Sequence, residues 1–275
     1  MLEDKLIQLE QIFLQMPKAI VAFSGGVDSS LVSFVAHRIL GDHVIAVTAR
    51  SPSLLPEELE EAKIQAKSMG IRHEIIETQE MQNPNYSSNP INRCYFCKSE
   101  LHDRLKEIAY QRGYSYVLDG VNLDDLSDYR PGVQAAKERG VRSPLAEVGM
   151  TKSEVRELSR KLGLSWWDKP ASPCLSSRFP YGETITPIKL ERVGRAEIYL
   201  RKLGYRNVRV RCQEDVARIE LPAETIKDFI NNEDITTLIS TFRSFGFVYV
   251  TLDLEGYRSG KLNQVLQSQN VKNFG

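Results

Sequence analysis

The stretch Ala19-Ile-Val-Ala-Phe-Ser-Gly-Gly-Val-Asp-Ser-Ser30 decides the fold class of this chain. It opens with a short apolar run, typical of a buried strand, and continues through a glycine turn into Leu31–Leu40, where apolar residues recur at helical spacing. A strand, a glycine turn and a helix in this order direct backbone N–H groups and the positive end of the helix dipole toward one point. This arrangement favours the binding of a phosphate group.

The glycine turn itself carries residues suited to a phosphate. Gly25 and Gly26 allow positive φ and a close approach of the backbone, and the hydroxyl groups of Ser24 and Ser29 add hydrogen-bond donors. The turn is not a Walker A loop, because it lacks the sequence Gly-Lys-Ser or Gly-Lys-Thr. A serine-rich turn with a purely structural role is the alternative interpretation.

Outward from this stretch, segments with strand and helix patterns alternate. Strand patterns cover residues 44–48, 74–77 and 116–119, and a helix pattern covers residues 56–69. This alternation predicts an α/β fold with a doubly wound parallel sheet. Thr151-Lys-Ser-Glu154 has the spacing of a capping box and predicts a further helix that continues to Leu162.

A stretch rich in proline and serine, Trp167–Gly182, predicts a functional loop and the approximate domain boundary. We therefore expect a first domain over residues 1–170 and a smaller α+β domain over residues 171–275. In the second domain, the patterns predict a helix from Thr186-Pro187 to Leu203, paired strands at 208–212 and 216–221, and a strand at 248–252.

Composition and charge exclude several classes of protein. The 36 basic residues balance 36 acidic ones and the isoelectric point is near 6.9, so no global positive field would hold a nucleic-acid backbone. The N-terminal segment is charged and no long uncharged apolar run follows, which argues against a targeting peptide and a membrane span. We expect a cytoplasmic protein that binds neither nucleic acid nor a membrane.

Four cysteines are too few for a disulfide framework in a chain of 275 residues. Cys94 and Cys97 form a C-x-x-C pair, which suits zinc, an iron–sulfur cluster or a redox pair. Cys212 continues the apolar alternation of its strand, so we interpret it as a core residue. Cys174, in the loop rich in proline and serine, remains as a third ligand.

Three thiolates on a four-iron cluster leave one iron without a protein ligand, and that iron can carry an exogenous sulfide. A zinc site completed by His102 or by solvent is an open alternative. A redox pair is less favoured, because the C-x-x-C pair lies in a connection rich in proline and asparagine rather than directly after a strand.

The motif Ser24-Gly-Gly-Val-Asp-Ser29 resembles the pyrophosphate loop of the N-type ATP pyrophosphatases, which bind the β,γ-phosphates of ATP and release them as pyrophosphate. The resemblance implies that backbone near Ala49 reads the adenine and that Gly120 flanks the nucleotide. The implied ATP-binding residues are Ser24, Gly25, Gly26, Asp28, Ser29, Ala49, Gly120 and Arg130. Arg130 would steady the α-phosphate or simply occupy the start of a helix.

Carboxylates near this loop are candidate Mg²⁺ ligands, because hard oxygen ligands suit an ion that bridges phosphates. The candidates are Asp28, Asp124 and Asp125. Ordinary solvated loop carboxylates are the alternative interpretation of Asp124 and Asp125.

Further stretches resemble the LarE family over essentially the whole chain. They are Leu118-Asp-Gly120, Asp128-Tyr-Arg-Pro-Gly132, Ser176-Ser-Arg-Phe-Pro-Tyr-Gly182, Ala217-Arg-Ile-Glu-Leu221 and Tyr257-Arg-Ser-Gly260. LarE proteins are ATP-dependent sulfur transferases that convert the carboxylates of pyridinium-3,5-biscarboxylic acid mononucleotide to thiocarboxylates, on the way to the nickel-pincer cofactor of lactate racemase. The resemblance implies ATP, Mg²⁺, a source of sulfide and a hexamer.

LarE-like proteins are of two kinds, one that sacrifices the sulfur of a single cysteine and one that holds a [4Fe–4S] cluster on three cysteines. Cys94, Cys97 and Cys174 match the second kind, and the resemblance implies catalytic roles for Cys174 and Asp28. It also implies a set of substrate-binding residues in the matching stretches. They are Arg178, Glu197, Arg209, Arg211, Glu220, Asp228 and Arg258.

The alternation of one strand agrees with an anionic substrate. Arg209 and Arg211 share a strand face, opposite the apolar Val208, Val210 and Cys212, and Arg218 joins them from the neighbouring strand. Such a face suits a phosphate and carboxylates. A solvated, salt-bridged sheet face is the alternative interpretation.

Three other functions remain open. A tRNA thiolase pairs the same loop with a three-cysteine cluster, but it needs a basic face that this composition does not indicate. An amide-forming ATP pyrophosphatase of the GMP- or NAD-synthetase sort uses the loop with ammonia and gives three cysteines no role. A nucleotide-binding protein with structural zinc would bind ATP without releasing pyrophosphate.

Overall fold

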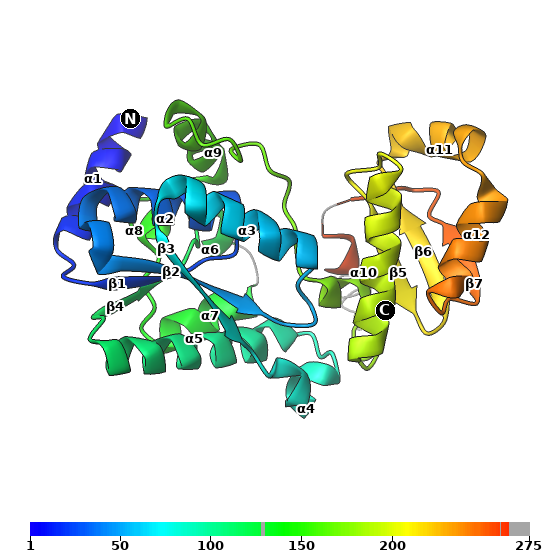
Figure 1. Ribbon diagram of the computed structural model, residues 1–275, viewed down its shortest axis with the longest axis horizontal. Helices are drawn as coiled ribbons and strands as arrows, with labels where there is room; N and C mark the ends of the chain where they lie inside the picture. The colour runs from blue at the N-terminus through cyan, green and yellow to red at the C-terminus, as the bar shows by residue number, and fades with distance from the viewer. Residues whose placement is uncertain (128–129, 259, 264–275) are drawn as a thin grey trace, which may run out of the picture. The chain divides into compact units, whose positions relative to one another are not determined.

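The computed structural model describes residues 1–127, 130–258 and 260–263. The chain divides into two compact units (Figure 1). Unit 1 comprises Met1–Tyr86 and Pro90–Ser172, and unit 2 comprises Ser87–Asn89 and the chain from Pro173 onward. The sequence predicted a boundary at residue 170, close to the observed one, but placed residues 87–89 in the first domain, whereas they belong to unit 2.

Unit 1 is built from strands and helices in alternation. Its strands are β1 (Ala19–Ala22), β2 (Val44–Arg50), β3 (Arg72–Glu77) and β4 (Tyr116–Leu118). Its helices are α1 (Leu2–Leu14), α2 (Val27–Leu40), α3 (Pro56–Met69), α4 (Pro84–Ser87, whose last residue belongs to unit 2), α5 (Arg93–Arg112), α6 (Leu123–Leu126), α7 (Pro131–Glu138), α8 (Pro144–Glu147) and α9 (Lys152–Lys161), with short 3₁₀ turns at Gly41–His43 and Glu80–Gln82.

The four strands form one parallel sheet in the order β3-β2-β1-β4. In Figure 1, α2 and α3 cover one face of this sheet and α5 and α7 the other. The predicted doubly wound α/β class is confirmed. In this order β1 lies between β2 and β4. The chain after β1 first forms β2 and β3 on one side of it and then returns to form β4 on the other side.

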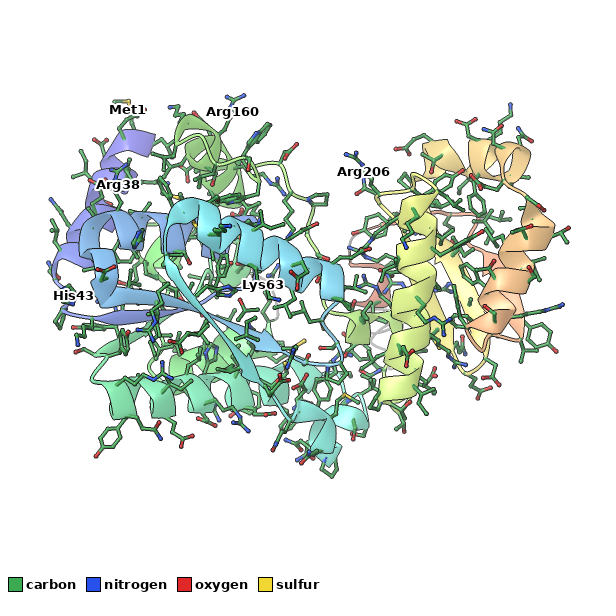
Figure 2. All side chains as sticks on the ribbon, in the orientation of Figure 1. Met1, Arg38, His43, Lys63, Arg160 and Arg206 are labelled. Carbon is green, nitrogen blue, oxygen red and sulfur yellow. The ribbon has the colours of Figure 1, made fainter. Side chains whose placement is uncertain are left out.

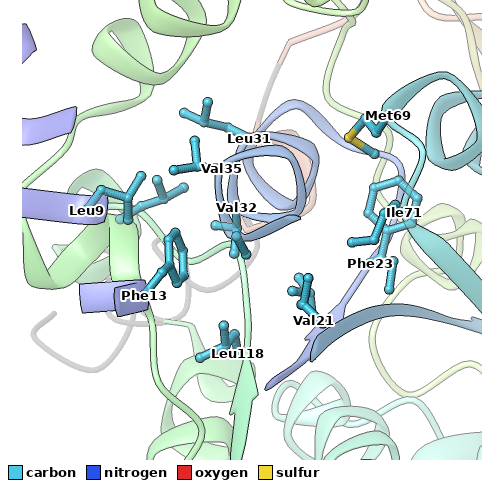
Figure 3. Close-up of a cluster of buried hydrophobic side chains, with 14 of the residues drawn as sticks. Leu9, Phe13, Val21, Phe23, Leu31, Val32, Val35, Met69, Ile71 and Leu118 are labelled. Carbon is cyan, nitrogen blue, oxygen red and sulfur yellow. The ribbon is translucent and has the colours of Figure 1, made fainter. Parts of the chain in front are cut away.

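Alternate residues of β1 pack on opposite faces of the sheet, as expected for a buried parallel strand. Val21 belongs to the larger apolar core, in which Phe13 of α1 and Val32 of α2 also lie (Figure 3). Ile20 belongs to a second core, together with Leu105 of α5. Burial on both faces explains why the strand reads as a continuous apolar run.

Two element boundaries differ from the sequence prediction. α2 begins at Val27, four residues before the predicted Leu31, because Asp28 and Ser29 are stable in the first turn of a helix although they break the apolar period. β2 continues to Arg50, two residues beyond the predicted end. The capping box is confirmed: the Thr151 hydroxyl accepts from the backbone N–H of Glu154, whose carboxylate accepts from the backbone N–H of Thr151.

Unit 2 has a three-stranded sheet in the order β5-β6-β7. Its elements are the 3₁₀ turn η3 (Leu175–Arg178), α10 (Pro187–Lys202), β5 (Arg209–Gln213), β6 (Val216–Glu220), η4 (Ala223–Thr225), α11 (Ile226–Asn232), α12 (Ile235–Ser244), β7 (Tyr249–Leu252) and η5 (Lys261–Asn263). β5 and β6 pair antiparallel, and β6 and β7 pair parallel. The predicted strand pair and the helix capped by Thr186 are confirmed.

The surface of both units carries long charged side chains. Figure 2 shows them extending from the ribbon, Arg160 of α9 among them, and Arg160 is exposed. Within the described residues, no helix has the length and apolar character needed to cross a membrane.

Candidate active site

The phosphate loop joins β1 to α2 at the carboxyl edge of the parallel sheet. Ligands of open α/β sheets bind at this edge, at the point where the strand order reverses. Here that point lies beside β1, because β2 and β4 flank it on opposite sides. The topology therefore places the loop where a nucleotide is expected.

Gly25 sets the course of the loop. Its φ is +68°, and a Cβ at this position would lie 3.0 Å from the Cβ of Ala62 on α3. Gly26 instead has an extended backbone, with φ −79° and ψ 161°, and is the N-cap of α2. Positive φ is thus used at Gly25 but not at Gly26.

Two serines hold the loop in shape. The backbone N–H of Ser24 donates to Ser29 Oγ at 3.2 Å, and the two hydroxyl oxygens are 3.1 Å apart. The hydroxyl of Ser29 also donates to the carbonyl oxygen of Gly26 at 3.2 Å. The loop is therefore ordered by its own side chains, and the first amides of α2 lie at the positive end of the helix dipole.

Asp28 lies in the first turn of α2, between an amide and a cation. Asn122 Nδ2 donates to Asp28 Oδ1 at 3.1 Å, and Lys152 Nζ forms an ion pair with Oδ2. Asn122 is only 2% exposed, and its Oδ1 accepts from the backbone N–H of Asp124 and of Asp125 at the start of α6. Two side chains outside the predicted site, Asn122 and Lys152, therefore fix the carboxylate.

A second lysine reaches the loop from the stretch rich in proline and serine. Lys169 Nζ donates to the carbonyl oxygen of Gly25 at 3.0 Å and lies 2.8 Å from a carboxylate oxygen of Glu61. Its side chain is 16% exposed. Lys169 lies in the predicted functional loop and Lys152 in the predicted capping box, but only the fold shows that both contact the phosphate loop and its first helical turn.

Gly120 follows β4 and approaches the loop closely. A Cβ at this position would lie 2.6 Å from the backbone N of Ser29 and 3.1 Å from the carbonyl carbon of Asp28. Both neighbours are backbone atoms, so no side-chain rotation would relieve the clash. The preceding Asp119 is buried, which raises the pKa of its carboxyl group despite hydrogen bonds from Ser143 and Val121.

The end of β2 is tied to the end of β1. The hydroxyl of Thr48 donates to the carbonyl oxygen of Phe23 at 2.6 Å and lies 2.8 Å from His73 Nε2. Burial lowers the pKa of His73, with repulsion from Lys63 in addition. Ala49 lies inside the extended β2, where it is paired with Ile76 of β3.

Asp125 and Arg130 form an ion pair at 2.6 Å, and Asp125 Oδ2 also accepts from the backbone N–H of Asn122 at 3.1 Å. Asp124 accepts from the backbone N–H of Lys152 at 2.8 Å. The carboxylates proposed for Mg²⁺ therefore already have protein partners. Asp128 and Tyr129 of the adjacent motif lie outside the described residues.

The C-x-x-C pair lies at the start of α5, with Cys94 in its first turn, and not in the preceding connection as the sequence suggested. Cys94 is exposed and Cys97 is partly exposed, and their spacing places both thiols on one face of the helix. Gly132 of α7 packs against this turn, because a Cβ there would lie 3.0 Å from Lys98 Cγ and 3.6 Å from the carbonyl oxygen of Cys94.

Cys94 and Cys97 belong to unit 1, whereas Cys174 belongs to unit 2. Over residues 1–127, 130–258 and 260–263, no group of three or more His, Cys, Asp or Glu side chains is placed to hold a metal ion. Cys212 is fully buried in β5, where burial raises the pKa of its thiol. Its predicted role as a core residue is confirmed.

Unit 2 contains a buried cluster of opposite charges around Glu197 of α10. Arg178 donates from Nε to Glu197 Oε1 at 2.7 Å and from Nη2 to Oε2 at 3.0 Å. The backbone N–H of Val210 and the guanidinium of Arg201 donate to the same carboxylate. Burial opposes ionisation of Glu197, but Arg178 and then Arg209 outweigh it, so the pKa of Glu197 is lowered.

A second buried carboxylate, Glu220 of β6, lies beside two arginines. Arg211 Nε donates to Glu220 Oε2 at 2.9 Å, and Arg218 lies 3.4 Å from Oε1. Arg211 and Arg218 are paired across the ladder, where like charges repel unless a counter-ion intervenes. The predicted alternation of arginine and apolar residues on β5 is confirmed, but the carboxylates are fully buried rather than part of a solvated face.

Arg209 completes this charged group. It is 7% exposed, its guanidinium lies 5.4 Å from the centre of the Tyr257 ring, and burial lowers its pKa, with repulsion from Arg178 in addition. Asp228 is exposed on α11, and Arg258 pairs with Glu255 at 3.1 Å. Within the described part of unit 2, neither contacts the carboxylates of the cluster, and Ser259 of the last motif lies outside that part.

Comparison with known proteins gives one family model and several similar proteins. Residues 9–111 match the family described as NAD synthase. The chain is 40% identical over 274 residues to a pyridinium-3,5-bisthiocarboxylic acid mononucleotide synthase of Lactiplantibacillus plantarum, and the match covers 99% of each chain. It is also 64% identical over 266 residues to an uncharacterized protein of Synechocystis sp., and this match covers 97% of this chain and 99% of that relative.

A more distant relative matches only part of the chain. It is a tRNA-specific 2-thiouridylase of Rickettsia rickettsii, 27% identical over 191 residues, which cover 56% of this chain and 52% of the relative.

Proposed function

The chain belongs to the LarE family of pyridinium-3,5-bisthiocarboxylic acid mononucleotide synthases, and from this membership we propose that it uses ATP to convert the carboxylates of a pyridinium mononucleotide to thiocarboxylates. A carboxylate oxygen attacks the α-phosphorus of ATP, the bond to pyrophosphate breaks, and an AMP ester forms. A sulfur nucleophile then adds to the acyl carbon and AMP leaves with the original oxygen. Without adenylation the leaving group would be oxide, which is why ATP is needed.

The observation that carries the ATP step is the phosphate loop at the start of α2. Gly25 gives the backbone its turn, and the amides after Gly26 point from the positive end of the helix. Lys152 and Lys169 add two cations beside this loop. We assign them to the β,γ-phosphates, where they stabilise charge that builds up on the departing pyrophosphate.

The remaining ATP contacts follow the family pattern. Ser24, Ser29, Ala49, Gly120 and Arg130 are proposed to line the nucleotide. Mg²⁺ would bind Asp28 and Asp125 after their present partners, Lys152 and Arg130, turn to phosphate oxygens. Carboxylate oxygens suit this ion, so the residues fit it chemically, and Mg²⁺ would neutralise phosphate charge.

Unit 2 is proposed to bind the substrate and to form the contacts of a hexamer. The site proposed for the substrate is the cluster of Arg178, Arg209, Arg211, Glu197 and Glu220, because guanidinium groups suit the phosphate and carboxylates of an anionic substrate. Asp228 and Arg258 are proposed for the edge of the same site.

The sulfur is proposed to come through Cys174. Cys94 and Cys97, one helical turn apart, fit two positions of a three-cysteine [4Fe–4S] site, and Cys174 of unit 2 would supply the third. When bound, such a cluster supplies an iron that has no protein ligand and can carry sulfide from an external source. The residues of the chain activate the carboxylate and hold the substrate.

The test supplies purified enzyme, prepared without oxygen, with MgATP, sulfide and pyridinium-3,5-biscarboxylic acid mononucleotide. We expect AMP, pyrophosphate and a product in which sulfur has replaced oxygen, detected by mass spectrometry. Iron and zinc are measured in the wild type and in Cys174→Ala. Iron that falls in the variant supports the cluster, whereas zinc without iron in both refutes it.

The tRNA thiolase alternative is tested with the same enzyme. Unmodified tRNA replaces the mononucleotide, and incorporation of sulfur into tRNA is measured. Sulfur transfer to tRNA but not to the mononucleotide would overturn the proposed substrate.

A further inference from the structure

Cys174 lies in unit 2, directly before the short turn η3. It is partly exposed, and its carbonyl oxygen accepts from the backbone N–H of Ser177 at 3.0 Å. The flanking residues 170–174 have no regular secondary structure. A cysteine that must present sulfur to an acyl carbon therefore depends on other residues to hold its segment in place.

Arg178 supplies this support. Its Nη1 donates to the carbonyl oxygens of Pro173 at 2.8 Å and Cys174 at 3.3 Å, and to the hydroxyl of Ser177 at 2.7 Å. Its Nε and Nη2 donate to Glu197. The guanidinium thus binds the Cys174 segment through Nη1 and α10 through Nε and Nη2.

The Arg178–Glu197 pair that anchors this connection is buried. Arg178 is 1% exposed and Glu197 is fully buried, and Glu197 Oε1 also accepts from the backbone N–H of Val210 on β5 at 3.0 Å. Arg211 of the same strand donates to the carbonyl oxygen of Ser177 at 2.7 Å. The Cys174 segment is therefore attached to the strand that carries the proposed substrate-binding arginines.

We propose that Arg178 is a positioning residue that fixes Cys174 relative to the substrate site, and not a residue that binds substrate. The planar guanidinium bridges a buried carboxylate and three oxygens of the cysteine segment, which a lysine cannot reproduce because its ammonium has a single centre. The inference rests on the proposed function only through the role of Cys174. It holds for either source of the transferred sulfur, a cluster or the cysteine itself.

The test compares Arg178→Lys with Arg201→Lys. Arg201 donates to the same Glu197 carboxylate, at 3.2 Å, from a position that is 21% exposed, so it controls for disturbance of that carboxylate. A nitroxide label is attached to Cys174 in a full-length chain with Cys94→Ser and Cys97→Ser. Cys212 is fully buried and is protected from the label.

We expect the electron paramagnetic resonance spectrum of the label to show faster motion in Arg178→Lys and no change in Arg201→Lys. In the unlabelled enzymes, Arg178→Lys should lower thiocarboxylate formation on the order of 100-fold, because small errors in position are costly in catalysis. Pyrophosphate release and the KM for the mononucleotide should stay within about twofold, because the adenylation step does not use Cys174. A raised KM together with unchanged label motion would overturn the inference.

If Arg178→Lys does not fold, Ser177→Ala removes one acceptor of Arg178 Nη1 without leaving a buried charge unpaired. Faster label motion in Ser177→Ala supports the inference, and unchanged motion overturns it. Full thiocarboxylate formation by Cys174→Ala would refute the proposed role of Cys174 instead. The label motion decides the role of Arg178 in either case.

Discussion

Substituting alanine for Gly120 tests the contact between β4 and the phosphate loop. The new Cβ would lie 2.6 Å from the backbone N of Ser29, whereas ordinary contacts begin near 3.4 Å. The two segments must therefore separate by about 0.8 Å, the difference between these distances. Overpacking of this kind costs about 1–3 kcal/mol, and each kcal/mol lowers Tm by roughly 2–4 °C in a chain of this size.

The same displacement moves an amide at the head of α2, where the phosphates are proposed to bind. We expect pyrophosphate release by Gly120→Ala to fall about 10- to 100-fold, because misplacement by about 1 Å can cost this much. Tm is measured by calorimetry, and pyrophosphate by a coupled assay with MgATP and the mononucleotide.

Gly140→Ala is the matched control. Gly140 has φ +67° and open space around its Cβ position, so alanine there strains the backbone by about 1–2 kcal/mol without touching the loop. We expect it to lower Tm and to leave pyrophosphate release unchanged. The reasoning is refuted if Gly120→Ala matches the wild type in both measurements, or if Gly140→Ala loses as much activity.

Two further predictions concern unit 1. Lys152→Met should lower pyrophosphate release on the order of 100-fold, because a cation beside the loop is lost. Lys161→Met on the same helix should match the wild type, because Lys161 pairs with Glu3 at the surface. Equal rates of pyrophosphate release for the two variants would contradict the assignment of Lys152. Burial lowers the pKa of His102 to about 3, with repulsion from Lys98 in addition. Between about pH 6.5 and pH 3, the unfolded chain therefore binds a proton at this histidine that the native chain does not. The free energy of unfolding falls as the pH is lowered through this range. The free energy of unfolding of His102→Leu, measured by denaturant titration, should fall less over this range than that of the wild type, by up to about 1.4 kcal/mol per pH unit; parallel profiles would contradict the prediction.

The sequence by itself determined the features that depend on local order along the chain. The apolar run before Gly25 predicted β1, the alternating patterns predicted the parallel sheet, and the spacing of Thr151 and Glu154 predicted a capped helix. Each depends on residues within a few positions of one another, so periodicity and turn chemistry suffice to predict it.

The start of α2 was harder to place. Asp28 and Ser29 interrupt the apolar period, and the turn they occupy is stabilised by the positive end of the helix dipole. The placement of the C-x-x-C pair on α5 was missed for a similar reason, because Cys94 and Cys97 precede the apolar residues that mark this helix.

Only the tertiary structure decided which distant side chains meet. The approach of Lys152 and Asn122 to Asp28, of Lys169 to Gly25, and of Arg178 to Glu197 joins residues that no local pattern pairs. A charged side chain shows its sign in the sequence but not its counter-ion, because the counter-ion is fixed by how the sheet and helices pack. For the same reason, the arginine face of β5 could be predicted from alternation, whereas the buried carboxylates that hold it in place could not.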